Sequence, residues 1–184
     1  MGVVDCIYNL KPLLLTMRKT LKWVLLLVVC ALVAYLVYGV AVKTERIKTS
    51  RSQRQQLPEA VFTTLQNQPF KTRSLTEDSL VFVYYNPECG HCQDFAQSIN
   101  AAQPRFANHQ FVWVSPAPKE QIRYFRDSLV QLNRANHRFV RDTAEAFYAA
   151  FGYHTFPSVL VYHHKNLFTA HQGDVKPELL LPKR

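Results

Sequence analysis

Residues 82–92 read Phe82-Val-Tyr-Tyr-Asn-Pro-Glu-Cys-Gly-His-Cys92, and they carry the strongest structural signal in the chain. They continue a run, Ser79-Leu-Val-Phe-Val-Tyr-Tyr85, that is nearly all apolar and rich in β-branched and aromatic residues. Such a run is typical of a central strand that is buried on both faces. Asn86-Pro87 ends the strand, and a stripe of apolar residues at helical spacing begins near Cys92. The two cysteines therefore lie where a buried strand meets a helix.

The spacing Cys89-Gly90-His91-Cys92 favours thiol–disulfide chemistry. Amides at a helix N-terminus offer free donors and a partial positive charge to the first sulfur, which favours the nucleophilic thiolate. Two intervening residues let the second sulfur reach the first. His91 adds a positive charge that favours the reduced form and makes a disulfide more oxidising. The alternatives are a structural disulfide and half of a zinc site, although the sequence has no second CxxC or HxxxH pair.

The segments around this motif alternate between strand-like and helix-like patterns. Strands are expected at 61–65, 69–73, 79–85, 110–115, 138–141, 157–162 and 167–171. Helices are expected at 92–102, at 118–129, from the capping residue Asp142 to Phe151, and at 175–181. Strands that alternate with helices imply parallel pairing, and the last two strands form an antiparallel edge. The sequence therefore predicts an α/β fold with a mixed central sheet and helices on both faces.

Two segments resemble known signatures of one family. Residues 82–92 resemble the active-site strand and helix of thioredoxin-like proteins, especially the membrane-anchored TlpA-like group. The segment Phe151-Gly-Tyr-His-Thr-Phe-Pro-Ser-Val-Leu-Val-Tyr162 is similar to the second signature of that family. In that signature a cis-proline precedes a core strand and lies opposite the redox cysteines. The resemblance extends from about Val61 to Leu181, and it implies a thioredoxin fold.

The resemblance also implies a thiol–disulfide oxidoreductase in which Cys89 attacks and Cys92 resolves. Gly90 and His91 are then the active-site dipeptide, and the same dipeptide occurs in protein disulfide isomerases. The substrate-binding loop is expected to consist of three residues, Thr155, Phe156 and a cis Pro157. The only cofactor implied is the redox-active disulfide Cys89–Cys92, without a metal ion. The expected partners are protein thiols or disulfides and a redox partner protein.

The sequence departs from the family pattern in two places. Glu88 replaces the usual Trp before the first cysteine, and its carboxylate opposes thiolate formation at Cys89. The buried acid that many relatives place behind the second cysteine has no counterpart, because residues 79–86 contain no Asp or Glu. Two alternatives to an oxidoreductase are a non-catalytic thioredoxin-fold binding module and a thiol peroxidase. The peroxidase requires a Thr-x-x-Cys setting, where this chain has Asn86-Pro-Glu-Cys89.

An uncharged apolar run extends from Trp23 to Val42. It has the length of roughly 20 residues that a helix needs to cross a bilayer. Aromatic residues stand toward its ends, and a short basic leader precedes it. This pattern predicts a single-pass signal anchor in a bacterial cytoplasmic (inner) membrane, with the soluble domain facing the periplasm or the cell exterior. A cleaved signal peptide is the alternative.

The expected organisation is a cytoplasmic leader at 1–22, a transmembrane helix at 23–42, a linker at 43–58 and a thioredoxin-like domain at 59–184. Met17 is an alternative start. The formal net charge is +9, but the basic residues are scattered among acids and form no dense stripe. We therefore expect no nucleic-acid partner and a basic surface that faces an anionic membrane.

Overall fold

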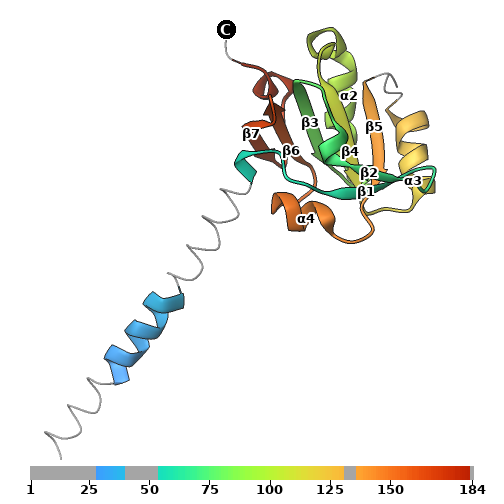
Figure 1. The fold of residues 1–184 in the computed structure, drawn as a ribbon. Helices are drawn as coiled ribbons and strands as arrows, with labels where there is room; N and C mark the ends of the chain where they lie inside the picture. Colours follow the sequence, from blue (N-terminus) through green and yellow to red (C-terminus); the bar gives the residue numbers. More distant parts are fainter. Residues whose placement is uncertain (1–27, 40–53, 131–135, 183–184) are drawn as a thin grey trace, which may run out of the picture. The chain divides into compact units, whose positions relative to one another are not determined.

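The computed structural model describes residues 28–39, 54–130 and 136–182 (Figure 1). The chain forms two compact units, Met1–Thr49 and Ser50–Arg184. In the first unit, residues 28–39 form a helix whose side chains are all exposed. Across the described ranges, no helix is both long enough and apolar enough to cross a bilayer. The predicted leader, both ends of the predicted span and residues 43–53 of the predicted linker lie outside the described residues.

The second unit is built on a seven-stranded sheet with the order β2-β1-β5-β4-β3-β6-β7. Strands β3, β4 and β5 pair in parallel, and all other pairs are antiparallel. The mixed sheet that the sequence predicts is therefore confirmed. The strands are β1 (Val61–Thr64), β2 (Pro69–Lys71), β3 (Ser79–Tyr84), β4 (Gln110–Ser115), β5 (His137–Arg141), β6 (Ser158–His163) and β7 (Asn166–Gln172).

Strand β3 lies inside the sheet, and all six of its residues are buried. Successive side chains of a strand point to opposite faces, so β3 contributes to two separate apolar cores. Val81, Val83 and the following Tyr85 belong to one core, together with Cys92. Leu80, Phe82 and Tyr84 belong to the other core. This double burial explains why the strand is an almost unbroken apolar run.

Helices cover both faces of the sheet, as the sequence predicts (Figure 1). Helices α2 (Gly90–Ala101) and α3 (Lys119–Tyr124) pack on the face that holds Cys92. Helix α4 (Ala146–Phe151) packs on the opposite face. The remaining helical turns are η1 (Thr72–Ser74), η2 (Gln103–Phe106), η3 (Phe125–Leu129) and η4 (Pro177–Leu180).

The helices differ in their bounds or type from the expected ones. Helix α2 begins at Gly90 instead of Cys92. The predicted helix 118–129 changes after Tyr124 into a π turn, in which the amide of Val130 donates to Phe125 at 3.1 Å. The predicted terminal helix is only the 3-10 turn η4. It is short because Pro182 disfavours helical backbone at the preceding residue.

The predicted helix from Asp142 to Phe151 begins later than expected, at Ala146 with Glu145 as its N-cap, but its C-terminal end is confirmed. The Asp142 carboxylate accepts hydrogen bonds from the amides of Ala146 and Phe147, both at 2.9 Å, and so satisfies amides at the start of α4. Gly152 ends the helix with a φ of 73°, a left-handed conformation that glycine adopts without steric cost.

The chain packs onto the sheet from Arg54 onward, ahead of the predicted domain start at Glu59. The amide of Leu57 donates to the carbonyl of Lys165 at 2.7 Å. The Arg54 guanidinium lies 4.9 Å from the centroid of the Tyr153 ring. The folded unit therefore includes residues 54–58.

His137 connects a buried hydrogen bond to the pH dependence of folding. The indole N–H of Trp113 donates to Nδ1 of His137 at 2.9 Å, so the neutral ring carries its proton on Nε2. Burial lowers the pKa of His137 to about 4. A second proton on Nδ1 of His137 would point at the indole N–H of Trp113 and remove the acceptor of this hydrogen bond. The fold therefore keeps this ring neutral under conditions in which the unfolded chain binds a proton.

We expect the free energy of unfolding to decrease as the pH falls from 6.5 toward about 4. The folded pKa lies below the unfolded one, so the unfolded state binds more protons in this window and stability is lost on acidification. The loss attributable to His137 is about 3 kcal/mol. Urea unfolding at neutral pH and at about pH 4 measures this loss of unfolding free energy. The His137→Gln variant should lack this part of the pH dependence, and an equally steep dependence in the variant would contradict the assignment.

Candidate redox site

The cysteine motif lies at the junction between β3 and α2. After β3 the chain turns through Asn86 and Pro87, and the amide of Cys89 donates to the carbonyl of Asn86 at 3.1 Å. Cys89 is the N-cap of α2, and its carbonyl accepts the amides of Cys92 and Gln93 at 3.0 and 3.1 Å. The predicted placement of the first cysteine at a helix N-terminus is therefore found in the structure.

The two thiols differ strongly in their surroundings. Both are free, but Cys89 is partly exposed, whereas Cys92 is 0% exposed and packs in the core. Burial raises the pKa of the Cys92 thiol to about 12. A hydrogen bond with the Asn86 backbone lowers that pKa, and the side-chain hydrogen bond and charge of Cys89 raise it. The two thiols therefore influence each other, and within this pair only Cys89 is exposed to solvent.

The second predicted segment lies at the same end of the sheet. Strands β3 and β6 are antiparallel, and Tyr84 at the end of β3 pairs with Ser158 at the start of β6. The segment before Ser158 therefore lies beside the turn that leads to Cys89. The peptide bond between Phe156 and Pro157 is cis, as the resemblance implies. The hydroxyl of Ser158 donates to the carbonyl of Thr155 at 2.7 Å and fixes the turn.

Phe156 connects this segment to both cores of the domain. It is partly buried and packs against the apolar clusters on both faces of the sheet. Its ring centroid lies 4.8 Å from that of Tyr84. Cys89 packs against the same α2-side cluster. The two predicted segments are thus assembled into one region.

The comparisons with known proteins give a consistent structural result. Neither a protein-family model nor a curated protein matches the sequence. The structure of DsbF from Mycobacterium tuberculosis superposes with a TM-score of 0.56 at 21% identity, covering 70% of this chain and 92% of DsbF. A secreted M. tuberculosis disulfide oxidoreductase homologous to E. coli DsbE superposes with a TM-score of 0.57 at 20% identity, and the match covers 70% of this chain and 94% of that protein. A thioredoxin-family thiol:disulfide interchange protein from Chlorobium tepidum superposes with a TM-score of 0.55 at 15% identity, and the match covers 67% of this chain and 88% of that protein.

The chain has a thioredoxin fold. Both predicted signatures occupy adjoining positions at one end of the sheet of this fold. The low sequence identities make this a likeness of architecture, so the roles of Cys89, Cys92 and residues 155–157 rest on the local geometry.

The residues that flank the cysteines in sequence, Glu88, Gly90 and His91, are exposed. The carboxylate of Glu88, the residue that departs from the family pattern, accepts a hydrogen bond from Gln121 of α3 at 3.2 Å. Gly90 and His91 are exposed in the first turn of α2. Within the described ranges, no group of three or more His, Cys, Asp or Glu side chains is arranged to hold a metal ion.

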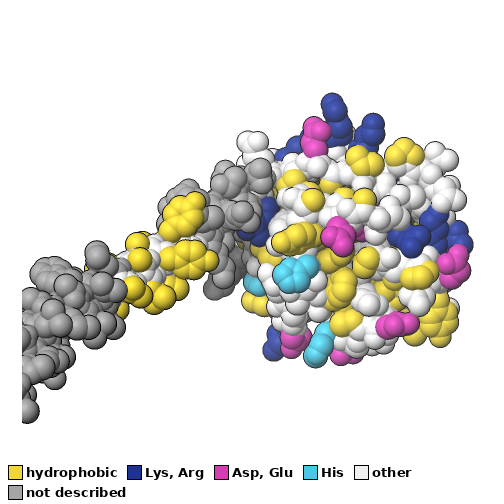
Figure 2. Space-filling model, turned by 90° about the horizontal axis from the view of Figure 1, so that it is seen from below, with side chains coloured by type: hydrophobic (Ala, Val, Ile, Leu, Met, Phe, Trp, Pro, Cys, Tyr) yellow, Lys and Arg dark blue, Asp and Glu magenta, His cyan; other side chains and the backbone are white. Residues whose placement is uncertain are grey.

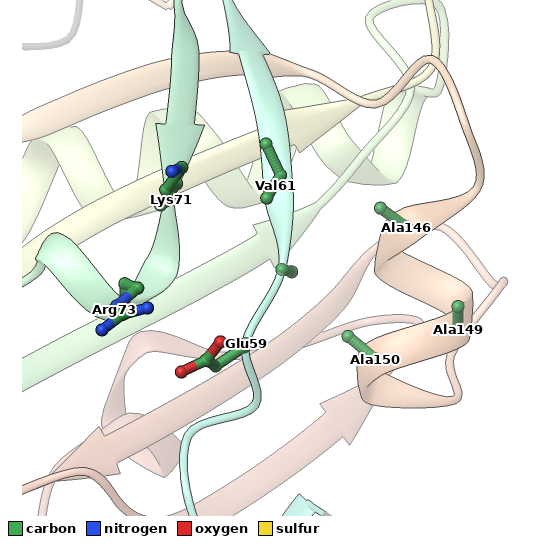
Figure 3. Close-up of a pocket in the computed structure, with 8 residues that line it drawn as sticks. Glu59, Val61, Lys71, Arg73, Ala146, Ala149 and Ala150 are labelled. Atoms are coloured by element: carbon green, nitrogen blue, oxygen red, sulfur yellow. The ribbon is translucent and has the colours of Figure 1, made fainter.

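A separate groove of about 550 Å³ lies between the β1–β2 hairpin and α4 (Figure 3). Lys71, Arg73 and Glu59 stand on one side of it, and three alanines of α4 stand on the other. No lining residue belongs to the cysteine motif or to residues 155–157. The groove is therefore not part of the thioredoxin-fold redox site.

The surface of the thioredoxin-fold unit is mixed in charge. On the face in Figure 2, Lys and Arg side chains stand among Asp, Glu and apolar side chains, and the residues drawn in colour form no continuous basic surface. This face offers no basic track of the kind that nucleic-acid backbones require.

Sequence reasoning missed one residue of this region. Tyr85, directly after β3, packs in the same core as Cys92. Burial and the charge of Cys92 raise the pKa of Tyr85, and Arg126 lowers it. The signal was present in the sequence, because Tyr85 shares the β3 face with Val81 and Val83 and therefore points toward α2.

Proposed function

We propose that this chain is a membrane-anchored thiol–disulfide oxidoreductase that exchanges disulfides with protein thiols through Cys89 and Cys92. One observation carries the proposal. A partly exposed cysteine is the N-cap of a helix, and a second, buried cysteine lies in the first turn of that helix, where the two thiols influence each other. This arrangement suits a two-step exchange, because the exposed Cys89 sulfur can react with the client and the buried Cys92 sulfur can then react with Cys89.

In the proposed reaction the Cys89 thiolate attacks a client disulfide, a mixed disulfide forms and one client thiolate leaves. Cys92 then loses its proton and attacks the Cys89 sulfur. The mixed disulfide breaks, and the second client thiolate leaves. The client gains two electrons, and the chain ends with a Cys89–Cys92 disulfide. The same steps in reverse oxidise a client dithiol, so the sequence of events serves both directions of electron flow.

Residues 155–157 are proposed to hold the client next to Cys89. An extended client segment can pair with backbone groups of this turn, while the Phe156 ring offers an apolar contact. The partial burial of Phe156 supports this role, since part of its side chain stays accessible to a client. The similar structures that are described as disulfide oxidoreductases also support this function.

The proposed location is a bacterial cytoplasmic membrane, with the thioredoxin-fold unit facing the periplasm or the cell exterior. The uncharged run from Trp23 to Val42 supports an anchor, as does the exposure of the apolar side chains of residues 28–39. The compartment outside the cytoplasm is oxidising, which suits an enzyme of disulfide exchange.

Client trapping tests the proposed reaction and location together. The full-length Cys92→Ala variant, expressed in bacteria, cannot resolve mixed disulfides and should accumulate them through Cys89. We expect reducible, higher-mass conjugates in the membrane fraction after a carbonate wash.

The matched control is the Cys89→Ala/Cys92→Ala variant, which should form none of these conjugates. Equal conjugation in both variants would overturn the assignment of Cys89. Conjugates that are released by the carbonate wash would overturn the membrane anchor and leave the chemistry intact.

A further inference from the structure

Two histidine rings meet at the end of the sheet that lies away from the cysteines. His163 is the last residue of β6 and pairs with Ser79 at the start of β3, whereas the cysteines follow the other end of β3. His109 directly precedes β4. The centroids of the two imidazole rings are 6.1 Å apart. The pair therefore joins the two strands, β4 and β6, that lie on either side of β3.

Three of the four ring nitrogens of this pair have no hydrogen-bond partner in the described structure. They are Nδ1 and Nε2 of His109 and Nε2 of His163, and all three atoms are buried. Buried polar nitrogens without a partner are uncommon, because their desolvation is costly and nothing offsets it. Each residue as a whole is only partly buried, so the pair lies close to the surface. A ligand that reaches these nitrogens from solvent would remove the cost.

The fourth nitrogen orients the His163 ring. Nδ1 of His163 lies 3.1 Å from the hydroxyl oxygen of Ser79. When Nδ1–H donates to this oxygen, Nε2 keeps its lone pair. Histidines that bind metal ions are typically fixed in this way, by a hydrogen bond at the other ring nitrogen. Aromatic neighbours hold both imidazoles, since Phe168 lies 5.0 Å from His163 and Phe106 lies 5.3 Å from His109, measured between ring centroids.

The distance between the rings suits a shared metal ion. Bonds from zinc to histidine nitrogen are about 2.0–2.1 Å long, so two imidazoles on one ion have ring centroids about 5–6 Å apart. The observed 6.1 Å lies at the upper end of this range. Metal ions bind the neutral imidazole, and burial, with a further contribution from His163, lowers the pKa of His109. The His109 ring is therefore neutral at neutral pH and ready to bind.

We propose that His109 and His163 together bind one divalent transition metal ion of the zinc type, through one nitrogen of each ring. Imidazole is a preferred ligand of such ions. Within the described ranges, no third His, Cys, Asp or Glu side chain joins the pair, so water occupies the remaining positions of the ion. The bound ion connects the turn before β4 to the end of β6. The proposal does not depend on the redox reaction, because the cysteines lie beyond the other end of β3.

A Zn²⁺ titration of the full-length chain in detergent, followed by nitrogen NMR of the imidazole rings, tests the proposal. The chain carries no histidine tag, and the ring signals of its seven histidines are assigned through the backbone. We expect the signals of His109 and His163 to shift together along one saturation curve. Zinc that binds to the cysteines would instead shift the signals of His91, so the two locations are distinguished in one experiment.

Calorimetric titration measures the affinity in a full-length chain whose four cysteines are replaced by Ala, so that no thiolate competes for the ion. In this background, His109→Gln and His163→Gln should each weaken zinc binding at least about tenfold. The matched control is His164→Gln, because His164 is the next residue but is exposed, with its Nδ1 3.1 Å from the Asp78 carboxylate. This control should bind zinc as the parent does. Zinc at about 100 times the dissociation constant should raise the melting temperature of the parent and the control, but of neither ligand variant.

Three outcomes would overturn the metal site. They are a chain whose His109 and His163 signals do not respond to zinc, an affinity that neither ligand variant weakens, and an equal loss in His164→Gln. If a variant fails to fold, as its circular dichroism spectrum without zinc would show, the NMR titration of the unaltered chain decides alone. A failure of the redox function leaves this result unchanged, because the titration involves no thiol exchange.

Discussion

The Cys89→Ala variant is expected to reduce a fluorogenic peptide disulfide no faster than the uncatalysed reaction with the same reductant. Cys89 is the thiol of the pair that is exposed to solvent, whereas Cys92 is buried, and burial raises its pKa to about 12. Cys92 therefore cannot replace the missing nucleophile, since the thiolate is the reactive form. Stopped-flow or plate fluorescence measures the loss directly.

The Cys30→Ala variant is the control for cysteine removal as such. Cys30 lies in the exposed helix formed by residues 28–39, in the other compact unit of the chain. Its replacement should leave the exchange rate unchanged. Substantial activity in Cys89→Ala, or an equal loss in both variants, would mean that the nucleophile has been assigned wrongly.

The Trp113→Ala variant is expected to lose about 3–5 kcal/mol of unfolding free energy. Trp113 is fully buried in β4, and its ring stacks on Phe139 with centroids 5.8 Å apart. Truncation opens a cavity under α2 and leaves His137 without its indole donor. Because small domains have only about 5–15 kcal/mol of stability, this one change removes a large part of it. Urea unfolding followed by circular dichroism measures the effect.

Trp113→Phe separates packing from hydrogen bonding at the same position. The phenyl ring keeps most of the contact with Phe139 but cannot donate to His137, so the loss should be clearly smaller than for Ala. If both variants were equally stable, the stacked core would contribute little, and the hydrogen bond would be the dominant interaction of Trp113.

Sequence reasoning located the features that depend on strong local patterns. The run that became β3 is nearly all apolar because both of its faces are buried, and its β-branched and aromatic composition favours a strand. The position of the CxxC at the strand–helix junction followed from the same local pattern, and the cis bond before Pro157 followed from the resemblance. These features are encoded in consecutive residues.

The remaining differences depend on contacts between distant residues. The start of α2 at Gly90 is set by the turn from Asn86, and the π turn from Phe125 lets that ring and Ile122 pack into one core. Tyr85 was counted only as part of an apolar strand, because nothing in its immediate sequence shows that its hydroxyl lacks a partner. That property appears only when β3, α2 and α3 are packed together.

Equilibration of the full-length chain with glutathione buffers of defined ratio tests the redox pair most directly. The fraction of the chain with a Cys89–Cys92 disulfide is measured by acid quenching, alkylation and mass spectrometry of the peptide that contains both cysteines. The account predicts one reversible two-electron transition that is confined to this peptide and is abolished in Cys89→Ala and in Cys92→Ala. A pair that stays reduced or stays oxidised at every buffer ratio, or that forms only glutathione adducts, would contradict a redox-active disulfide.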